Sequence, residues 1–168
     1  MTISSEENSV FRAVEIAQML LVENNVDAVV ITAVDLAGSP EQVLLRNRKT
    51  PLNSAKATLS FDREVNGWMI GEGAGTVVLK SMKNAKKDHE QIYATLDALE
   101  FANGVSAESV EDAGEKALKS AKLTADEIGI LEVFGSGNEH EDKAEMSGLS
   151  SLYSGKNSSC AIGGIKAN

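Results

Sequence analysis

The sequence predicts an α/β protein, because segments with helical periodicity alternate with short runs rich in β-branched residues. The predicted order of elements is α-β-β-β-α-β-α-β, and no flexible linker, internal repeat or low-complexity stretch interrupts it. The chain has 168 residues, of which 42% are hydrophobic, as in an ordinary globular protein. A chain of this length suits one compact domain, since domains cluster near roughly 100–200 residues.

The N-terminal part predicts a helix and a strand, followed by a break and a few helical turns. The helix is expected over residues 4–23, where apolar side chains recur close to helical spacing. Ser4 and Glu7 fit the S-x-x-E capping box and predict where this helix begins. Residues 26–34 are apolar and β-branched, which indicates a buried strand. One or two helical turns are expected over residues 40–45.

The rest of the chain continues the alternation of helices and strands. Residues 67–80 are rich in glycine but end in TVVLK, which favours a strand or hairpin. A charged turn is expected over residues 85–90, and a further strand over residues 93–101. The C-terminal elements are a helix over 105–121, a short turn at 124–127, a strand over 128–134, a helix over 142–153 and a strand over 159–165.

Composition excludes several classes of protein. A net charge of −9 argues against binding to nucleic acid or an anionic membrane, and most of the acidic excess lies in residues 85–168. This excess is most simply interpreted as a solvated acidic surface. No apolar stretch approaches the about 20 residues that span a bilayer, and no signal peptide is visible. The single cysteine, Cys160, excludes an intramolecular disulfide and a cysteine-built zinc site and fits a reducing cytosol.

The candidate catalytic and ligand-binding patterns are weak when each is taken alone. The run Gly71-Glu-Gly-Ala-Gly75 lacks the lysine of a P-loop and opens no helix, so close packing of the backbone explains it better than a nucleotide site. The segment Glu139-His-Glu-Asp142 and Glu145 offer oxygen ligands for Mg²⁺ or Ca²⁺, but acidic residues are also expected at a helix N-terminus. Cys160 lies in a strand-like stretch, which favours a small buried hydrophobe over a nucleophile.

Three blocks of the sequence stand out together. The block from Phe61-Asp62 to Lys80 follows F-D-x-x-x-x-G-x-x-x-G-E-G-x-G and ends in a strand-like run. Residues 132–145 read EVFGSGN and then Asp142 and Glu145, similar to E-x-H-G-T-G-T followed by D-x-x-E. Residues 162–168, IGGIKAN, are similar to G-S-V-K-S-N. In this order and spacing the blocks resemble the β-ketoacyl synthase branch of the thiolase-like proteins over essentially the whole chain.

The resemblance implies a thiolase-like fold with αβαβα layers, of which this chain covers the middle portion only. Residues 1–91 would end the N-terminal ketosynthase-like half, and residues 92–168 would begin the C-terminal half. The implied activity is that of a 3-oxoacyl-[acyl-carrier-protein] synthase, an acyltransferase that extends acyl chains by decarboxylative Claisen condensation. Such an enzyme uses a cysteine nucleophile, two histidines and a lysine. Its substrates arrive on the phosphopantetheine of an acyl carrier protein, and no cofactor or metal is expected in the domain itself.

This chain departs from the family at its catalytic positions. Glu7 stands at the position of the cysteine and Phe134 at that of the first histidine, while Lys166 alone keeps the expected residue type. The second histidine would lie beyond Asn168. A carboxylate cannot form the thioester, and a phenyl ring cannot donate a hydrogen bond to a developing negative charge. We therefore expect no condensation by this chain, with Glu7 serving as a helix cap and Phe134 filling apolar volume.

Such losses resemble the chain-length factors, the degenerate ketosynthase partners in polyketide and polyunsaturated fatty acid synthases. Residues 3–18, 26–38 and 68–80 look closest to such a domain of a polyunsaturated fatty acid synthase. The resemblance implies a cytoplasmic, non-catalytic domain that pairs with an active ketosynthase as a homo- or heterodimer, shapes its acyl tunnel and meets an acyl carrier protein. It implies no nucleic-acid or membrane partner. A malonyl-carrier-protein decarboxylase and a pure dimerisation scaffold remain as alternatives.

Overall fold

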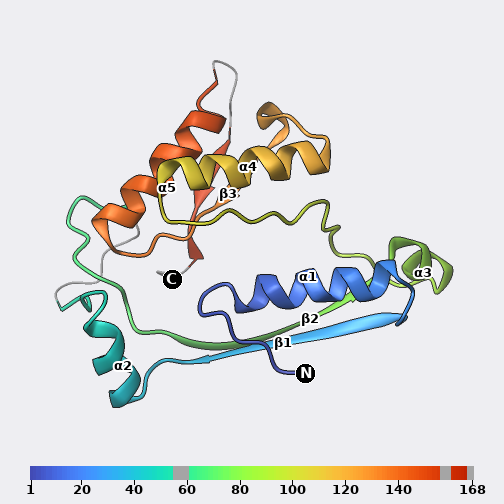
Figure 1. Ribbon diagram of the computed structural model, residues 1–168, viewed down its shortest axis with the longest axis horizontal. Helices are drawn as coiled ribbons and strands as arrows, with labels where there is room; N and C mark the ends of the chain where they lie inside the picture. The colour runs from blue at the N-terminus through green and yellow to red at the C-terminus, as the bar shows by residue number, and fades with distance from the viewer. Residues whose placement is uncertain (55–60, 156–159, 166–168) are drawn as a thin grey trace. The chain divides into compact units, whose positions relative to one another are not determined.

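The computed structural model describes residues 1–54, 61–155 and 160–165, and the chain separates into two compact units (Figure 1). Unit 1 comprises Met1–Leu36 and Glu72–Leu99, and unit 2 comprises Ala37–Gly71 and Glu100–Asn168. Each unit is therefore assembled from two separate stretches of the chain.

Unit 1 contains a two-stranded antiparallel sheet and a helix that packs on it. Strand β1 (Ala28–Leu36) pairs with β2 (Glu72–Lys80) over the full length of both strands. Helix α1 (Ser9–Val22) packs against β1 (Figure 1). Ala17 of the helix and Ile31 of the strand are buried, and with the buried Ala85 they form the small core of this unit. The expected helix and strand are confirmed, with bounds shifted by a few residues. The expectation that the strand is buried is wrong, since Ile31 is the one buried residue of β1.

The start of α1 differs from the prediction. The helix begins at Ser9, and its cap makes no side-chain hydrogen bond, so the predicted capping box of Ser4 and Glu7 is wrong. The Ser9 hydroxyl donates to the carbonyl oxygen of Glu6 at 2.6 Å and accepts from the N–H of Ser5 at 2.8 Å. These bonds close a turn in which Glu6 has a φ of +49°. A serine side chain that binds nearby backbone offers the chain an alternative to helix, which explains the later start.

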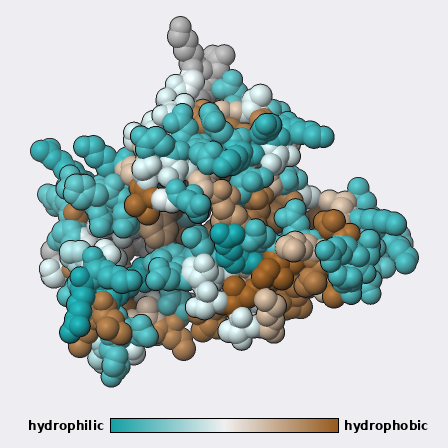
Figure 2. Space-filling view, in the orientation of Figure 1, coloured by the Kyte–Doolittle hydropathy of each residue, from teal (hydrophilic) through white to brown (hydrophobic). Residues whose placement is uncertain are grey.

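Unit 1 exposes a large amount of apolar surface. Four side chains of one face of the sheet are more than half exposed: Val30, Val34, Leu36 and Val78. A second exposed apolar stripe runs along α1 and consists of Phe11, Met19 and Val22. Figure 2 shows hydrophobic side chains gathered over the part of the surface where β1 and β2 lie. Contiguous apolar patches are typical of surfaces that contact another polypeptide, a membrane or a ligand.

A charged cluster ties the end of β2 to the segment that follows helix α3 (Met82–Lys87). The Lys80 ammonium donates to the carboxylates of Asp88 at 2.6 Å and Glu90 at 2.8 Å. The hydrogen bonds to Asp88 and then to Glu90 raise the pKa of Lys80 above its ordinary 10.5, and the bond from Lys80 lowers the pKa of Asp88 below 3.8. The cluster therefore stabilises the fold only while both groups are charged.

Asp88→Asn is expected to lower the urea midpoint of the chain at neutral pH, followed by circular dichroism. Stabilisation from Asp88 is present above its ordinary pKa and is lost as the pH falls through its lowered value. Stabilisation from Lys80 is present below pH 10.5 and is lost as the pH rises through its raised pKa. The difference between the two proteins should thus vanish in strong acid and in strong alkali. Asp112→Asn, which breaks the more exposed Lys116–Asp112 pair, is the control and should change the midpoint less.

Unit 2 packs helices beside a small parallel sheet. Its elements are α2 (Pro40–Asn47), α4 (Ala107–Ala121), a 3₁₀ turn (Ala125–Glu127), β3 (Ile130–Glu132), α5 (Glu139–Tyr153) and β4 (Ala161–Gly163). Strands β3 and β4 are parallel, and α4 packs against α5 (Figure 1). Polar side chains set the helix starts: the oxygens of Ser39, Ser106 and Asn138 accept from backbone N–H groups of the first turns.

The crossing of α4 and α5 depends on Gly148. A Cβ atom there would lie 2.5 Å from the carbonyl oxygen of Ala107 and 2.7 Å from Cβ of Val110. We expect Gly148→Ala to destabilise unit 2 by about 1–3 kcal/mol, because neither neighbour can move freely. Gly114→Ala is the matched control on α4, since its new methyl meets only the flexible end of Leu152 and alanine favours the helix. Urea unfolding should show a lower midpoint for the first variant, and equal midpoints would contradict this packing.

Several predicted elements differ from the structure. Residues 85–90 were expected as a turn, but α3 starts at Met82, since Ser81 caps it by accepting from the N–H of Asn84. The glycine-rich block contributes the single strand β2 and no hairpin. Within the described chain, residues 93–101 pair with no strand, and an extended segment needs a partner to form a ladder. The remaining predicted helices and strands of unit 2 are present, with β3 and β4 shorter than expected.

None of the described helices is long and apolar enough to cross a bilayer.

Candidate functional site

The loop after β3, residues 134–138, is held by a carboxylate from α5. Glu145 accepts from the N–H of Phe134 through Oε1 at 2.7 Å and from the N–H of Gly135 through Oε2 at 3.0 Å. Hydrogen bonds to an ionised acceptor are about twice as strong as neutral ones. Glu145 therefore fixes the backbone on which the side chain of Phe134 is mounted.

A second carboxylate holds the middle of the same loop. Asp142 is only 5% exposed, and its Oδ1 accepts from both the N–H of Ser136 at 2.7 Å and the Ser136 hydroxyl at 2.9 Å. The Ser136 hydroxyl oxygen in turn accepts from the N–H of Asn138 at 3.0 Å. Oδ2 of Asp142 makes no hydrogen bond within the described residues. The acidic segment at the start of α5 thus organises the loop through Asp142 and Glu145.

The loop also touches the block that begins at Phe61. A Cβ atom on Gly137, where φ is +82°, would overlap the carbonyl oxygen of Gly67. Gly67 itself has a φ of +144°, and a Cβ atom there would overlap the carbonyl oxygen of Pro51. Only glycine fits such close backbone contacts in these conformations. Two sequence blocks that lie far apart in the chain therefore meet at Gly67 and Gly137.

Trp68 anchors this contact. It is 5% exposed; its indole N–H donates to the carbonyl oxygen of Thr50 at 3.0 Å, and its backbone exchanges hydrogen bonds with Pro51 and Asn53. The Arg46 guanidinium lies 4.5 Å from the centre of the Trp68 ring, in cation–π geometry. The tryptophan thus joins α2 to the segment that supports the loop.

The third sequence block lies beside the second through the parallel strands. Leu131 pairs with Ile162, and the Val133 N–H donates to the carbonyl oxygen of Gly163 at 2.9 Å. Oε1 of Glu132 accepts from the N–H of Ile165 at 2.7 Å. Residue 165 directly precedes Lys166, which lies outside the described residues. Glu132 therefore holds the backbone that leads to the predicted lysine position.

Glu7 and Phe134, the two positions that the sequence predicts as substituted, lie in different units. Phe134 is 41% exposed at the end of β3 in unit 2, and its ring offers neither a proton nor a lone pair. Glu7 is exposed in unit 1, in the turn that precedes α1 and directly after the positive-φ residue Glu6. Neither side chain carries a thiol that could form a thioester or a ring N–H that could donate a hydrogen bond.

The structure adds no support for the other candidate sites, which are the glycine-rich run, the acidic segment as a metal site, and Cys160. Gly71, Gly73 and Gly75 have open space where a Cβ would stand, so packing does not explain them within the described chain. No group of three His, Cys, Asp or Glu side chains that could hold a metal ion occurs in the described ranges. Cys160 is a half-buried free thiol.

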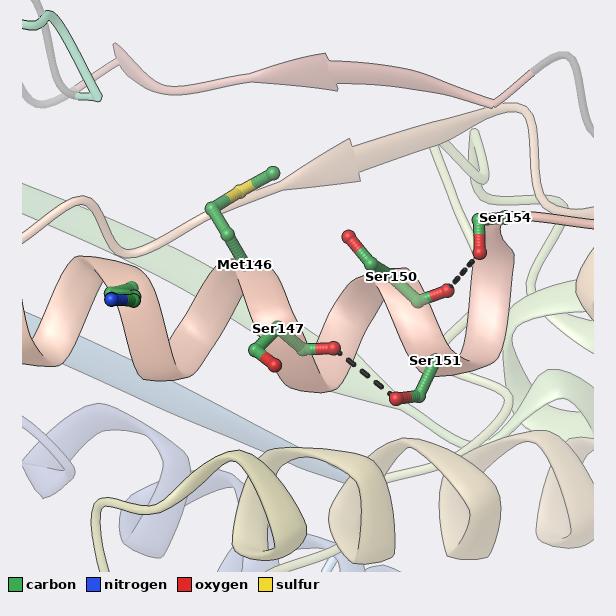
Figure 3. Close-up of a pocket in the computed structure, with 6 residues that line it drawn as sticks. Met146, Ser147, Ser150, Ser151 and Ser154 are labelled. Carbon is green, nitrogen blue, oxygen red and sulfur yellow. Dashed lines mark hydrogen bonds between the residues drawn. The ribbon is translucent and has the colours of Figure 1, made fainter.

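A shallow pocket lies along α5 (Figure 3). Ser147 and Ser151 lie on the side of α5 opposite Met146 (Figure 3). The hydroxyls of Ser151 and Ser154 donate to carbonyl oxygens one turn earlier in the same helix.

Sequence reasoning missed two supporting features. Glu132 was placed in a family block, but its bond to the backbone of Ile165 has no local signal. The contact between Gly67 and Gly137 was also missed, although a glycine at a fixed place in each block was its visible trace. Both features are contacts between residues far apart in the sequence, which local sequence patterns do not predict.

Comparison with known families gives a match along nearly the whole chain. The model of the β-ketoacyl synthase N-terminal domain matches residues 1–85, and that of the C-terminal domain matches residues 93–168. The chain belongs to the β-ketoacyl synthase family. The family resemblance and the partial thiolase-like fold predicted from the sequence are thereby confirmed.

Individual relatives agree with this assignment. The chain is 34% identical over 140 residues to a polyunsaturated fatty acid synthase protein of Thraustochytrium sp., covering 83% of this chain and 6% of that protein. It is 27% identical to polyketide synthase PksL of Bacillus subtilis, covering 91% of this chain and 4% of that protein. The chain therefore spans less than a tenth of the length of these curated relatives.

Solved structures show the same fold. A PfaC keto synthase-chain length factor is 38% identical with a TM-score of 0.85, covering 96% of this chain and 17% of that chain. A ketosynthase domain of Streptomyces albus, 22% identical with a TM-score of 0.84, covers 95% of this chain and 30% of its own, and shows the fold alone.

Proposed function

We propose that this chain is part of a non-catalytic, chain-length-factor-like domain of a polyunsaturated fatty acid or polyketide synthase. In this role it pairs with an active ketosynthase and shapes the tunnel that holds the growing acyl chain. The observation that carries the proposal is Phe134, which stands in a loop that Glu145 and Asp142 hold in place but cannot donate a hydrogen bond. Stabilisation of an oxyanion needs preorganised hydrogen-bond donors. The loop that would hold such a donor is present, but the side chain at residue 134 cannot donate.

Glu7 supports the same conclusion from the other family position. A carboxylate does not form the acyl thioester that a condensing enzyme needs, and its charge opposes an enolate nearby. The name of one similar protein of known structure, the PfaC keto synthase-chain length factor, combines a ketosynthase with a chain-length factor, the two partners of this proposal.

The exposed apolar stripe of α1 gives the domain a surface for its partner or for acyl chains. A helix with apolar residues on more than one side is normally covered on more than one side. In this proposal Met19 and Leu20 of α1 lie in the wall of the acyl tunnel. Substrates arrive on the phosphopantetheine of an acyl carrier protein in the cytoplasm, and the complete domain forms a homo- or heterodimer.

We further propose that the two ketosynthase-like halves meet near residues 91 and 92. The family matches to residues 1–85 and 93–168 support a boundary in this interval. Lys166 then follows β4, and Glu132 holds the backbone just before it at Ile165.

The test is the product length of the full-length protein assembled with its active ketosynthase. Met19→Trp narrows the proposed tunnel, so we expect shorter acyl products at an unchanged level of assembly. Glu115→Trp is the control, because Glu115 is an exposed residue of α4, a different helix from the one that carries the proposed wall. Unchanged products from both Met19→Trp and Leu20→Trp would refute tunnel shaping and leave a dimerisation scaffold. Carbon dioxide release from malonyl-carrier protein that Glu7→Ala abolishes would instead establish a decarboxylase.

A further inference from the structure

We draw no further inference here: the strongest candidate, the exposed apolar face of the β1–β2 sheet in unit 1 formed by Val30, Val34, Leu36 and Val78, carries none, because nothing in the described part of the structure shows what covers it.

Discussion

Replacing Gly137 by alanine is expected to destabilise unit 2 by about 3 kcal/mol or more, one of the two largest effects we anticipate. The new methyl group would overlap the carbonyl oxygen of Gly67, and the backbone at residue 137 has a φ of +82° that alanine avoids. The atoms nearest the new methyl group all belong to the backbone, so no flexible side chain can move aside to make room for it. The urea midpoint followed by Trp68 fluorescence measures the effect, since Trp68 is the sole tryptophan and is buried at this contact.

Gly129→Ala is the matched control in the same unit. A Cβ atom at Gly129 meets nothing within 4 Å, and its φ lies outside the left-handed range. This variant should keep the midpoint or raise it slightly, because alanine restricts the unfolded chain. Equal stability of Gly137→Ala and Gly129→Ala would contradict the close approach of the two backbones.

The second large effect is expected from Glu145→Gln, which should destabilise unit 2 by about 1.5–3 kcal/mol. Glutamine has only one amide oxygen, so one of the N–H groups of Phe134 and Gly135 would face the NH₂ group in place of an acceptor. We expect faster amide hydrogen exchange at residues 134 and 135 as well as a lower urea midpoint.

Glu141→Gln provides the control for the loss of charge on the same helix. Glu141 stands in the first turn of α5, and none of the described hydrogen bonds or ion pairs involves its carboxylate. Its substitution should cost only the interaction with the helix dipole, about 0.3–1 kcal/mol. Equal effects of the two variants would show that Glu145 acts as a charge and not as a fixed double acceptor.

The helices of unit 2 were largely predictable because their signals are local. Helix α4 follows from amphipathic spacing and from Ser106, whose oxygen accepts from the N–H of Ser109. The same kind of local signal failed at Ser4 and Glu7, where the motif fits but the Ser9 hydroxyl closes a competing turn. A capping pattern shows which two side chains could cap a helix, but whether they do so depends on the conformation of the surrounding backbone.

Residues 93–101 show the limit of pattern reasoning for strands. They are rich in apolar residues, yet a strand exists only when another chain segment completes its hydrogen bonds. The loop at the candidate site was recognised from the family pattern, but its contacts were not predicted. The family pattern singled out residues 132–145 but could not say that Asp142 and Glu145 act on the loop backbone, because that depends on the path of α5.

The contact between Gly67 and Gly137 also bears on how the chain reaches its folded state. About 70 residues separate the two glycines, so their meeting closes a long loop, whereas α4 and α5 are joined by a much shorter connection. Non-local closures are slow, and local helix pairs form early. We therefore expect the α4–α5 pair to form first and Trp68 to lose contact with water last, so that indole burial reports the final step of folding.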